Sequence, residues 1–290
     1  MNCSRWIRVL GRGTAWAFVI LMIMGGSSAG VGEKTPGTCL GASSGRQAEG
    51  GGDLPRGSDQ TYRAHCVPEA AIVLDGRADE PAWTEAAVET GFAFSWKAAP
   101  APATEFRALA DETHIYFTFR VRDDDIVAME RLRDEEDGVF EDRIEMYFGR
   151  DEQMKDYYCL EVDSRGRVFD YRASYPRRFD SKWNCAGLEA RSAALPQGYE
   201  VEGRIPIETF SALGFPVLRP GVRIRCGLYR AEFSHDRSGR PVEQQANIHT
   251  MGRQPVGPPP IEDWLSWVDP KTKEPDFHVP SSMGWLEIVN

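Results

Sequence analysis

The sequence has 290 residues, of which 41% are hydrophobic, and a formal net charge of −10. This length and composition fit one domain of moderate size with appended segments. The negative charge argues against nucleic-acid and anionic-membrane partners, because both need a basic surface.

Residues 1–30 have the features of a secretory signal peptide. Three arginines precede the apolar run 15–24, and small residues suited to cleavage follow it. An uncleaved membrane anchor is the alternative, for which the apolar run is short. Residues 31–63 are rich in Gly, Ser and polar side chains and are predicted to form a flexible linker. We therefore expect a secreted or periplasmic protein with one folded domain over residues 64–290.

The folded part is predicted from short segments in which apolar and polar residues alternate, a period typical of β-strands. The clearest are 114–121 and 143–148, whose second face carries Tyr, Arg and Glu. The other predicted strands are 71–74, 92–96, 104–110, 157–162, 168–174, 183–193, 199–205, 223–233 and 285–289. Short helices are predicted at 81–87, with Asp79 as N-cap, and at 206–213. Many strands with two short helices predict an all-β fold, an antiparallel β-sandwich.

The cysteines permit more than one arrangement. One of the six lies in the predicted signal peptide, so an odd number remains and not all of them can pair within the chain. Cys159 and Cys185 both lie in predicted extended segments, and a disulfide between them or two buried free thiols are equally compatible with the sequence. No Cys-x-x-Cys occurs and the histidines lack ligand spacing, which argues against zinc.

Aromatic residues carry the clearest functional signal. The chain has eight Trp and nine Tyr, and a sugar ring stacks on an aromatic plane while its hydroxyls bind carboxylates and guanidinium groups. Enzyme motifs such as Gly-x-Ser-x-Gly or a phosphate-binding glycine loop are absent from the sequence. The pairs Asp142/Glu145 and Glu200/Glu202 suit weak glycoside hydrolysis in principle, but such pairs are common in an acidic chain.

Five segments in a fixed order carry a family resemblance: IVLDGRADEPAWTEA, FRALADETHIYFTFRVRDDD, EDRIEMYF, GYEVEGRIP and WVDPKTKEPDFHVPSSMGWLEI. Together they resemble carbohydrate-binding module family 9, known from modules attached to xylanases, over residues 72–289. The resemblance implies a non-catalytic β-sandwich that grips a terminal sugar between two aromatic side chains, often with structural calcium. The expected ligand is the end of a xylan-type or glucan-type polysaccharide or oligosaccharide, and a glycoside hydrolase is the expected partner.

The resemblance also indicates which residues bind the sugar. The two clamp positions fall at Phe140, next to Val139, and at Phe277, where characterised members have Trp. Glu145 matches the family's strand carboxylate, and Asp142 begins the Asp-x-x-Glu motif that Glu145 ends. The basic residue on the next strand falls near Glu161, an acid here, so Arg120 or Arg230 is expected to supply that contact. The predicted carbohydrate-binding residues are Phe140, Asp142, Glu145, Phe277, Arg120 and Arg230.

Three further interpretations concern single residue types. Five aspartates in predicted loops could supply oxygen ligands for calcium, although they lack the spacing of a recognised calcium-binding loop. The simpler interpretation is an acidic rim exposed to solvent. These residues are Asp123, Asp124, Asp125, Asp134 and Asp137. A haem-binding electron-transfer sandwich is the alternative function, with axial ligands from Met129, Met146, Met154, His114 and His278. Trp96 and Trp183 suit either a surface platform or the core.

Overall fold

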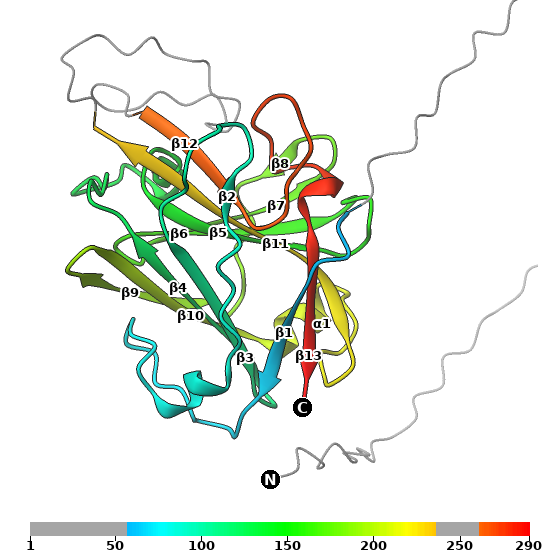
Figure 1. Ribbon diagram of the computed structural model, residues 1–290. Helices are drawn as coiled ribbons and strands as arrows, with labels where there is room; N and C mark the ends of the chain where they lie inside the picture. The colour runs from blue at the N-terminus through cyan, green and yellow to red at the C-terminus, as the bar shows by residue number, and fades with distance from the viewer. Residues whose placement is uncertain (1–56, 236–260) are drawn as a thin grey trace, which may run out of the picture. The chain divides into compact units, whose positions relative to one another are not determined.

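The strands of the protein form one curled sheet that folds into two packed layers (Figure 1). The computed structural model describes residues 57–235 and 261–290. The predicted signal peptide and residues 31–56 of the predicted linker therefore lie outside the described residues. Within the described part, no helix has the length and hydropathy to cross a membrane.

One layer has the strand order β9-β10-β4-β3-β1 and the other β13-β11-β5-β6-β7-β8, and the two join where β1 pairs with β13. The strands are β1 (Thr61–Cys66), β2 (Ala93–Phe94), β3 (Thr104–Ala110), β4 (His114–Arg122), β5 (Arg143–Gly149), β6 (Tyr157–Asp163), β7 (Val168–Ser174), β8 (Arg178–Asp180), β9 (Glu189–Leu195), β10 (Gly198–Pro206), β11 (Arg223–Ser234), β12 (Ile261–Ser266) and β13 (Gly284–Val289). The helices are η1 (Pro81–Glu85), η2 (Glu135–Phe140), α1 (Ile207–Ala212) and η3 (Pro280–Ser282). The all-β sandwich prediction is confirmed, and η1 and α1 are the two short helices expected from the sequence.

The inner core lies between the two layers and follows from the alternation of apolar residues. Phe117 and Phe119 of β4 face Ile144 and Met146 of β5, and all four side chains are fully buried. Burying a side chain of this size contributes about 1.5–3 kcal/mol. The opposite face of each strand is thereby turned outward, which is where the polar and aromatic residues of these strands lie.

β1 departs from the predicted domain boundary and from a purely antiparallel sandwich. It begins at Thr61, inside the predicted linker, and pairs in parallel with both β13 and β3. Tyr62 is buried, and its hydroxyl donates a hydrogen bond to the carbonyl of Ala87 at 2.7 Å. Only alternate residues of β1 face the core, so the segment has a polar composition and its start was assigned to the linker rather than to a strand.

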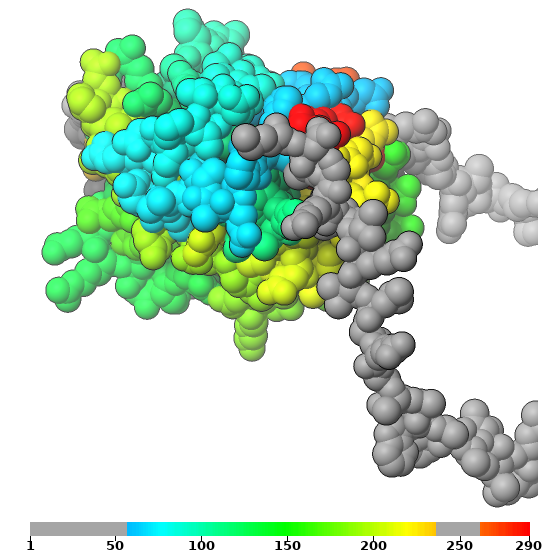
Figure 2. Space-filling model, turned by 90° about the horizontal axis from the view of Figure 1, so that it is seen from below, coloured from blue at the N-terminus to red at the C-terminus, as the bar shows by residue number. Residues whose placement is uncertain are grey.

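Some local predictions are wrong. Residues 71–74 run extended without joining the sheet, because Ile72 packs against Trp83 on the outer face of the β3–β4 layer. Figure 2 shows this part of the chain, in blue and cyan, forming the surface on that side. The N-cap of η1 is Glu80 rather than Asp79. Strands β8 and β12 were not predicted. Of the predicted strand 183–193, residues 189–193 belong to β9 and the first six residues lie outside any strand.

Cys159 and Cys185 are both free thiols. Cys159 is buried on the outer face of β6, whereas Cys185 packs against the inner core. The two side chains therefore lie on different sides of the sheet, and the disulfide alternative is wrong.

A buried carboxylate fastens the segment before η1 to the sheet. Glu202 of β10 accepts hydrogen bonds from the backbone N–H groups of Asp75 and Gly76, both at 3.0 Å, and from the Trp83 indole at 3.3 Å. Gly76 has a φ of +94°, a conformation that glycine adopts without strain. The turn at Asp75 and Gly76 thus binds Glu202 through its backbone N–H groups.

We expect the stabilising effect of Glu202 to depend on pH. Burial raises the pKa of Glu202 to about 7 from 4.5. The folded state binds this proton more tightly than the unfolded chain, so the stabilisation is complete below about pH 4.5 and is lost as the pH rises through about 7. In urea titrations, the stability of the wild type relative to Glu202→Gln should therefore fall over this range. A difference that stays constant or grows with pH would contradict this assignment.

Candidate functional site

The outward face of the β5–β6–β7–β11 layer carries a second cluster of buried aromatic residues, here called the outer cluster. Because side chains alternate along each strand, every second residue of these strands points away from the inner core. The outer cluster includes Tyr147, Tyr157, Phe169, Tyr171, Tyr229, Phe233, Trp264 and Phe277. Because these members are buried, a ligand would contact the side chains at the rim of the outer cluster rather than its centre.

Arg143 lies at the polar centre of the outer cluster. Its Nε donates a hydrogen bond to Oε2 of Glu161 at 2.7 Å, and its Nη2 lies 2.8 Å from Oε1 of Glu145. The remaining carboxylate oxygens accept hydrogen bonds from Tyr147, at 2.7 Å, and from Tyr171, at 2.8 Å. Arg143 and both carboxylates are almost completely buried. Arg143, on the same strand as Glu145, is therefore the arginine that pairs with Glu145, and the roles of Arg120 and Arg230 in sugar binding stay predictions.

Burial and the neighbouring charges shift the pKa values of the carboxyl groups around Arg143. Burial, together with repulsion from Glu161, raises the pKa of Glu145, and Arg143 partly opposes this. Burial also raises the pKa of Glu262 to about 8, against the attraction of Arg143. One oxygen of Glu262 is buried without a hydrogen-bond partner. The guanidinium carbon of Arg143 also lies 5.4 Å from the ring centre of Trp264, within the range of a cation–π contact.

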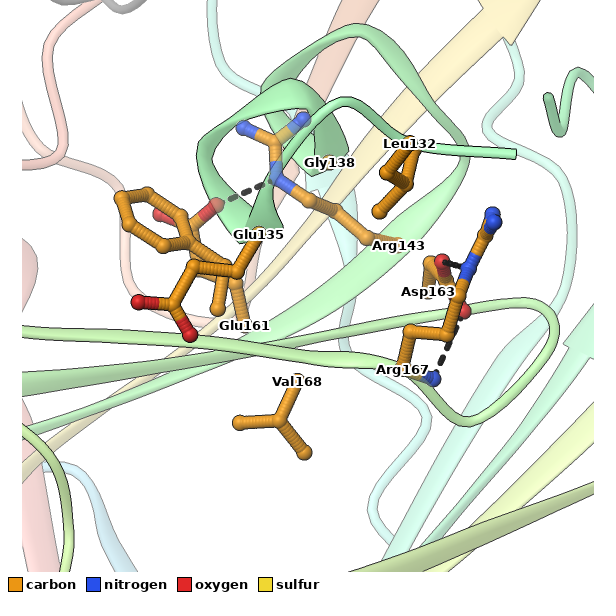
Figure 3. A pocket seen from close by; sticks show the side chains of 9 residues that line it. Leu132, Glu135, Gly138, Arg143, Glu161, Asp163, Arg167 and Val168 are labelled. Atoms are coloured by element: carbon orange, nitrogen blue, oxygen red, sulfur yellow. Dashed lines mark hydrogen bonds and ion pairs between the residues drawn. The ribbon is translucent and has the colours of Figure 1, made fainter.

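A small cavity adjoins this centre beneath η2. Figure 3 shows Arg143 reaching Glu161 and Arg167 reaching Asp163 within it. Its volume is about 10 Å³, about the space of one water molecule. A sugar ring does not fit there, so these ion pairs join β5 to β6 and fix the turn between β6 and β7 rather than receive a ligand.

The two predicted clamp rings do not face solvent. Phe277 is fully buried and stacks on Tyr229 with ring centres 4.2 Å apart and an interplanar angle of 18°. Phe140 lies in η2 and is 7% exposed. The open clamp predicted between these rings is therefore absent from this structure, because the loop before η3 inserts Phe277 into the outer cluster. Roles of Phe140, Phe277 and Glu145 in sugar binding stay predictions.

His278 follows Phe277 into the outer cluster. Its ring stacks on Tyr147 with centres 5.1 Å apart, and Nδ1 lies 3.0 Å from the hydroxyl of Tyr157. Met146 points into the inner core on the other face of β5. The two residues are separated by the sheet and cannot ligate one haem, so packing explains both better than the haem alternative.

Exposed aromatic residues lie at the rim of the outer cluster. Trp96 contacts Phe277 with ring centres 5.5 Å apart, and Phe179 contacts His278 at 4.9 Å. Both are only partly buried. Trp96 donates its indole N–H to the carbonyl of Thr272 at 3.1 Å, which fixes its orientation. These two rings, together with the partly buried Tyr175, are aromatic side chains at the rim that a ligand can reach.

Charged groups accompany these rings. The ion pair between Arg177 and Asp276 is 2.5 Å long and lies beside Phe179, with the guanidinium carbon 5.8 Å from the ring centre. On the other side, Lys97 pairs with Asp263 at 2.5 Å. From the sequence, Trp96 suits either a surface platform or the core, and Phe179 was not predicted. Phe179 is the single aromatic residue of the three-residue strand β8, so no periodic pattern in the sequence indicates its position.

The remaining predicted site residues lie elsewhere because of strand alternation. Asp142 and Arg230 face the inner side, whereas Glu145 faces outward, so Asp142 and Glu145 do not form a catalytic pair. Arg120 is exposed on β4, in the other layer. Glu202 is occupied by its backbone and indole donors, so the pair with Glu200 is structural. Structural calcium stays a prediction; among the described residues, Asp123, Asp142 and Glu232 form the carboxylate group close enough to hold a cation.

Comparison with known proteins agrees with this architecture. Residues 74–249 match the family model described as "Carbohydrate family 9 binding domain-like". A putative carbohydrate-binding protein from Bacteroides uniformis is 16% identical, with a TM-score of 0.56, over 80% of this chain and all of that chain. A family 9 carbohydrate-binding module from Caldicellulosiruptor kristjanssonii, solved with cellotriose, is 13% identical, with a TM-score of 0.47, over 80% of this chain and 94% of that chain. No curated protein sequence is significantly similar to the chain.

Proposed function

We propose, from the premise that the chain belongs to the carbohydrate family 9 binding domain-like family, that it is an exported protein that binds the end of a polysaccharide or oligosaccharide of the xylan or glucan type. Domains of this family bind carbohydrate without catalysis. The single observation that supports a site is the pair of partly exposed rings at the rim of the outer cluster, Trp96 and Phe179, which contact the buried residues Phe277 and His278. Export rests on the sequence of residues 1–30, and a glycoside hydrolase partner stays a prediction.

The chemistry of this surface suits a neutral sugar. The exposed rings offer planes for the C–H face of a pyranose. Arg177, Asp276, Lys97 and Asp263 provide donors and acceptors for hydroxyl groups around these planes. Their charges are balanced within each pair, so the surface does not select for a charged ligand. In this proposal the clamp is formed by Trp96 and Phe179 at the rim, while Phe277 and Glu145 support it from below.

Binding should be tested on the purified protein with soluble glucans, xylans and their oligosaccharides by affinity electrophoresis and isothermal titration calorimetry. We expect binding to at least one of these glycans and an affinity loss of about fivefold or more in Trp96→Ala and Phe179→Ala, because truncating an aromatic contact that carries binding energy costs more than about 1 kcal/mol. Trp183→Ala is the matched control, since Trp183 is also partly buried but packs on Tyr158 beside the inner core.

The outcomes separate the function from the site. Absence of binding to every glycan tested would contradict the proposed function. Binding that is weakened by Trp183→Ala but not by Trp96→Ala or Phe179→Ala would retain the function and contradict the proposed site.

A further inference from the structure

Three buried carboxylates meet on the inner side of β11, at the end of the sandwich where β4 ends and β5 begins. Asp123 follows β4, Asp142 precedes β5, and Glu232 belongs to β11. Their ligand atoms all lie within 4.8 Å of one another. Asp123 and Asp142 are buried, and Glu232 is nearly so. Like charges so close together need a compensating cation or proton.

One cation is already present among them. Arg230 is completely buried, and its Nη2 forms an ion pair with Glu232 and lies 3.7 Å from Oδ2 of Asp123. The same nitrogen donates a hydrogen bond to the carbonyl of Arg122 at 3.0 Å, and Nη1 donates to the Thr104 hydroxyl at 3.1 Å. The guanidinium is thus fixed by groups from β3, β4 and β11. If this arginine moved into solvent, the buried carbonyl, hydroxyl and carboxylate oxygens around it would lose their donor.

Backbone N–H groups bind both oxygens of Asp142 and one oxygen of Asp123, whereas Oδ2 of Asp123 is buried without a hydrogen-bond partner. Asp142 accepts hydrogen bonds from the N–H groups of Phe233, at 2.7 Å, and Val127. Oδ1 of Asp123 accepts one from the N–H of Asp125 at 2.8 Å. A calcium ion seeks six to eight oxygen ligands at 2.3–2.6 Å, and here it would also lie against a buried guanidinium of the same charge sign. This donor set therefore does not fit calcium while Arg230 keeps its place.

We propose that the Arg230 guanidinium is the resident cation of this cluster, and that the cluster is stable without calcium. The positive charge of the Arg230 side chain supplies the stabilisation that a bound metal ion would otherwise give. Because its partners come from both layers, the guanidinium also joins β11 to the ends of β3 and β4. This assignment is independent of whether the protein binds carbohydrate.

The first test compares melting temperatures in CaCl₂ and in EDTA, at equal ionic strength, for the wild type and Asp123→Asn. Calcium bound elsewhere shifts both proteins equally, so the comparison isolates this cluster. We expect the same shift in both. A larger calcium-induced rise in the wild type than in Asp123→Asn would overturn the proposal.

The second test removes the cation. Arg230→Met should lower the melting temperature far more than Arg120→Met, the control, because Arg120 is exposed. The variant Arg230→Met/Asp123→Asn/Glu232→Gln, which also removes two of the negative charges, should recover part of this loss. If Arg230→Met does not fold, the folding of the triple variant still supports the proposal. A triple variant no more stable than Arg230→Met would overturn it.

Discussion

Arg143→Met is expected to lower the free energy of unfolding by about 3–5 kcal/mol, because it leaves two buried carboxylates without their cation. Glu145 and Glu161 lie within 2.8 Å of Arg143 and are shielded from solvent by the outer cluster. Methionine has similar length and fills much of the same space, so loss of charge rather than loss of volume dominates. Urea or guanidinium denaturation measures the effect.

Arg172→Met is the matched control for this prediction. Arg172 also pairs with a carboxylate, Asp156 at 2.5 Å, but its side chain is exposed. Exposed ion pairs contribute about 0–1 kcal/mol. Adding Glu145→Gln and Glu161→Gln to Arg143→Met should restore part of the stability. Equal losses in Arg143→Met and Arg172→Met would show that the buried ion-pair centre is not formed as described.

Phe277→Ala is expected to destabilise the protein by about 3–5 kcal/mol, the usual cost of truncating a buried aromatic residue. Phe277 is fully buried, stacks on Tyr229, and contacts Trp96 and Trp264 with ring centres 5.5 Å away in each case. Thermal and denaturant unfolding should therefore show the main effect of this change.

This prediction distinguishes the two roles considered for Phe277. Phe179→Ala serves as the control, because Phe179 is partly exposed and its truncation should cost less stability. If Phe277→Ala unfolds like the wild type and loses only glycan affinity, then Phe277 is the exposed clamp ring that the sequence predicted, and its buried position does not represent the binding state.

Much of the fold could be predicted because alternation identifies β-strands directly. The segments around β4 and β5 show a strict period of two, and the inner core contains their apolar residues. β1 was not predicted because its six residues follow a polar stretch and pair mainly with β13, at the other end of the chain. Sequence pattern indicates which residues face inward, but it does not indicate which distant strands pair.

The site was predicted less well than the fold, and alternation explains both the success and the failure. Alternation places Arg143 and Glu145 on one face of β5, and the strand register sets Glu145 opposite Glu161 of β6. The ion pairs of Arg143 could therefore have been predicted from the sequence. The same rule excludes Arg230 and Asp142 from that face. The burial of Phe277 could not be foreseen, because it depends on the path of an irregular loop that has no period.

The most direct test of carbohydrate binding at the rim of the outer cluster is an NMR titration of the full chain labelled with ¹⁵N-tryptophan. The indole signals of Trp96 and Trp264 are assigned with single-substitution variants and followed as a xylan or glucan oligosaccharide is added. We predict that the Trp96 and Trp264 signals shift in a saturable manner, whereas those of Trp83 and Trp183, which lie away from the outer cluster, do not. Absence of any shift with all oligosaccharides, or shifts confined to Trp83 and Trp183, would contradict the account.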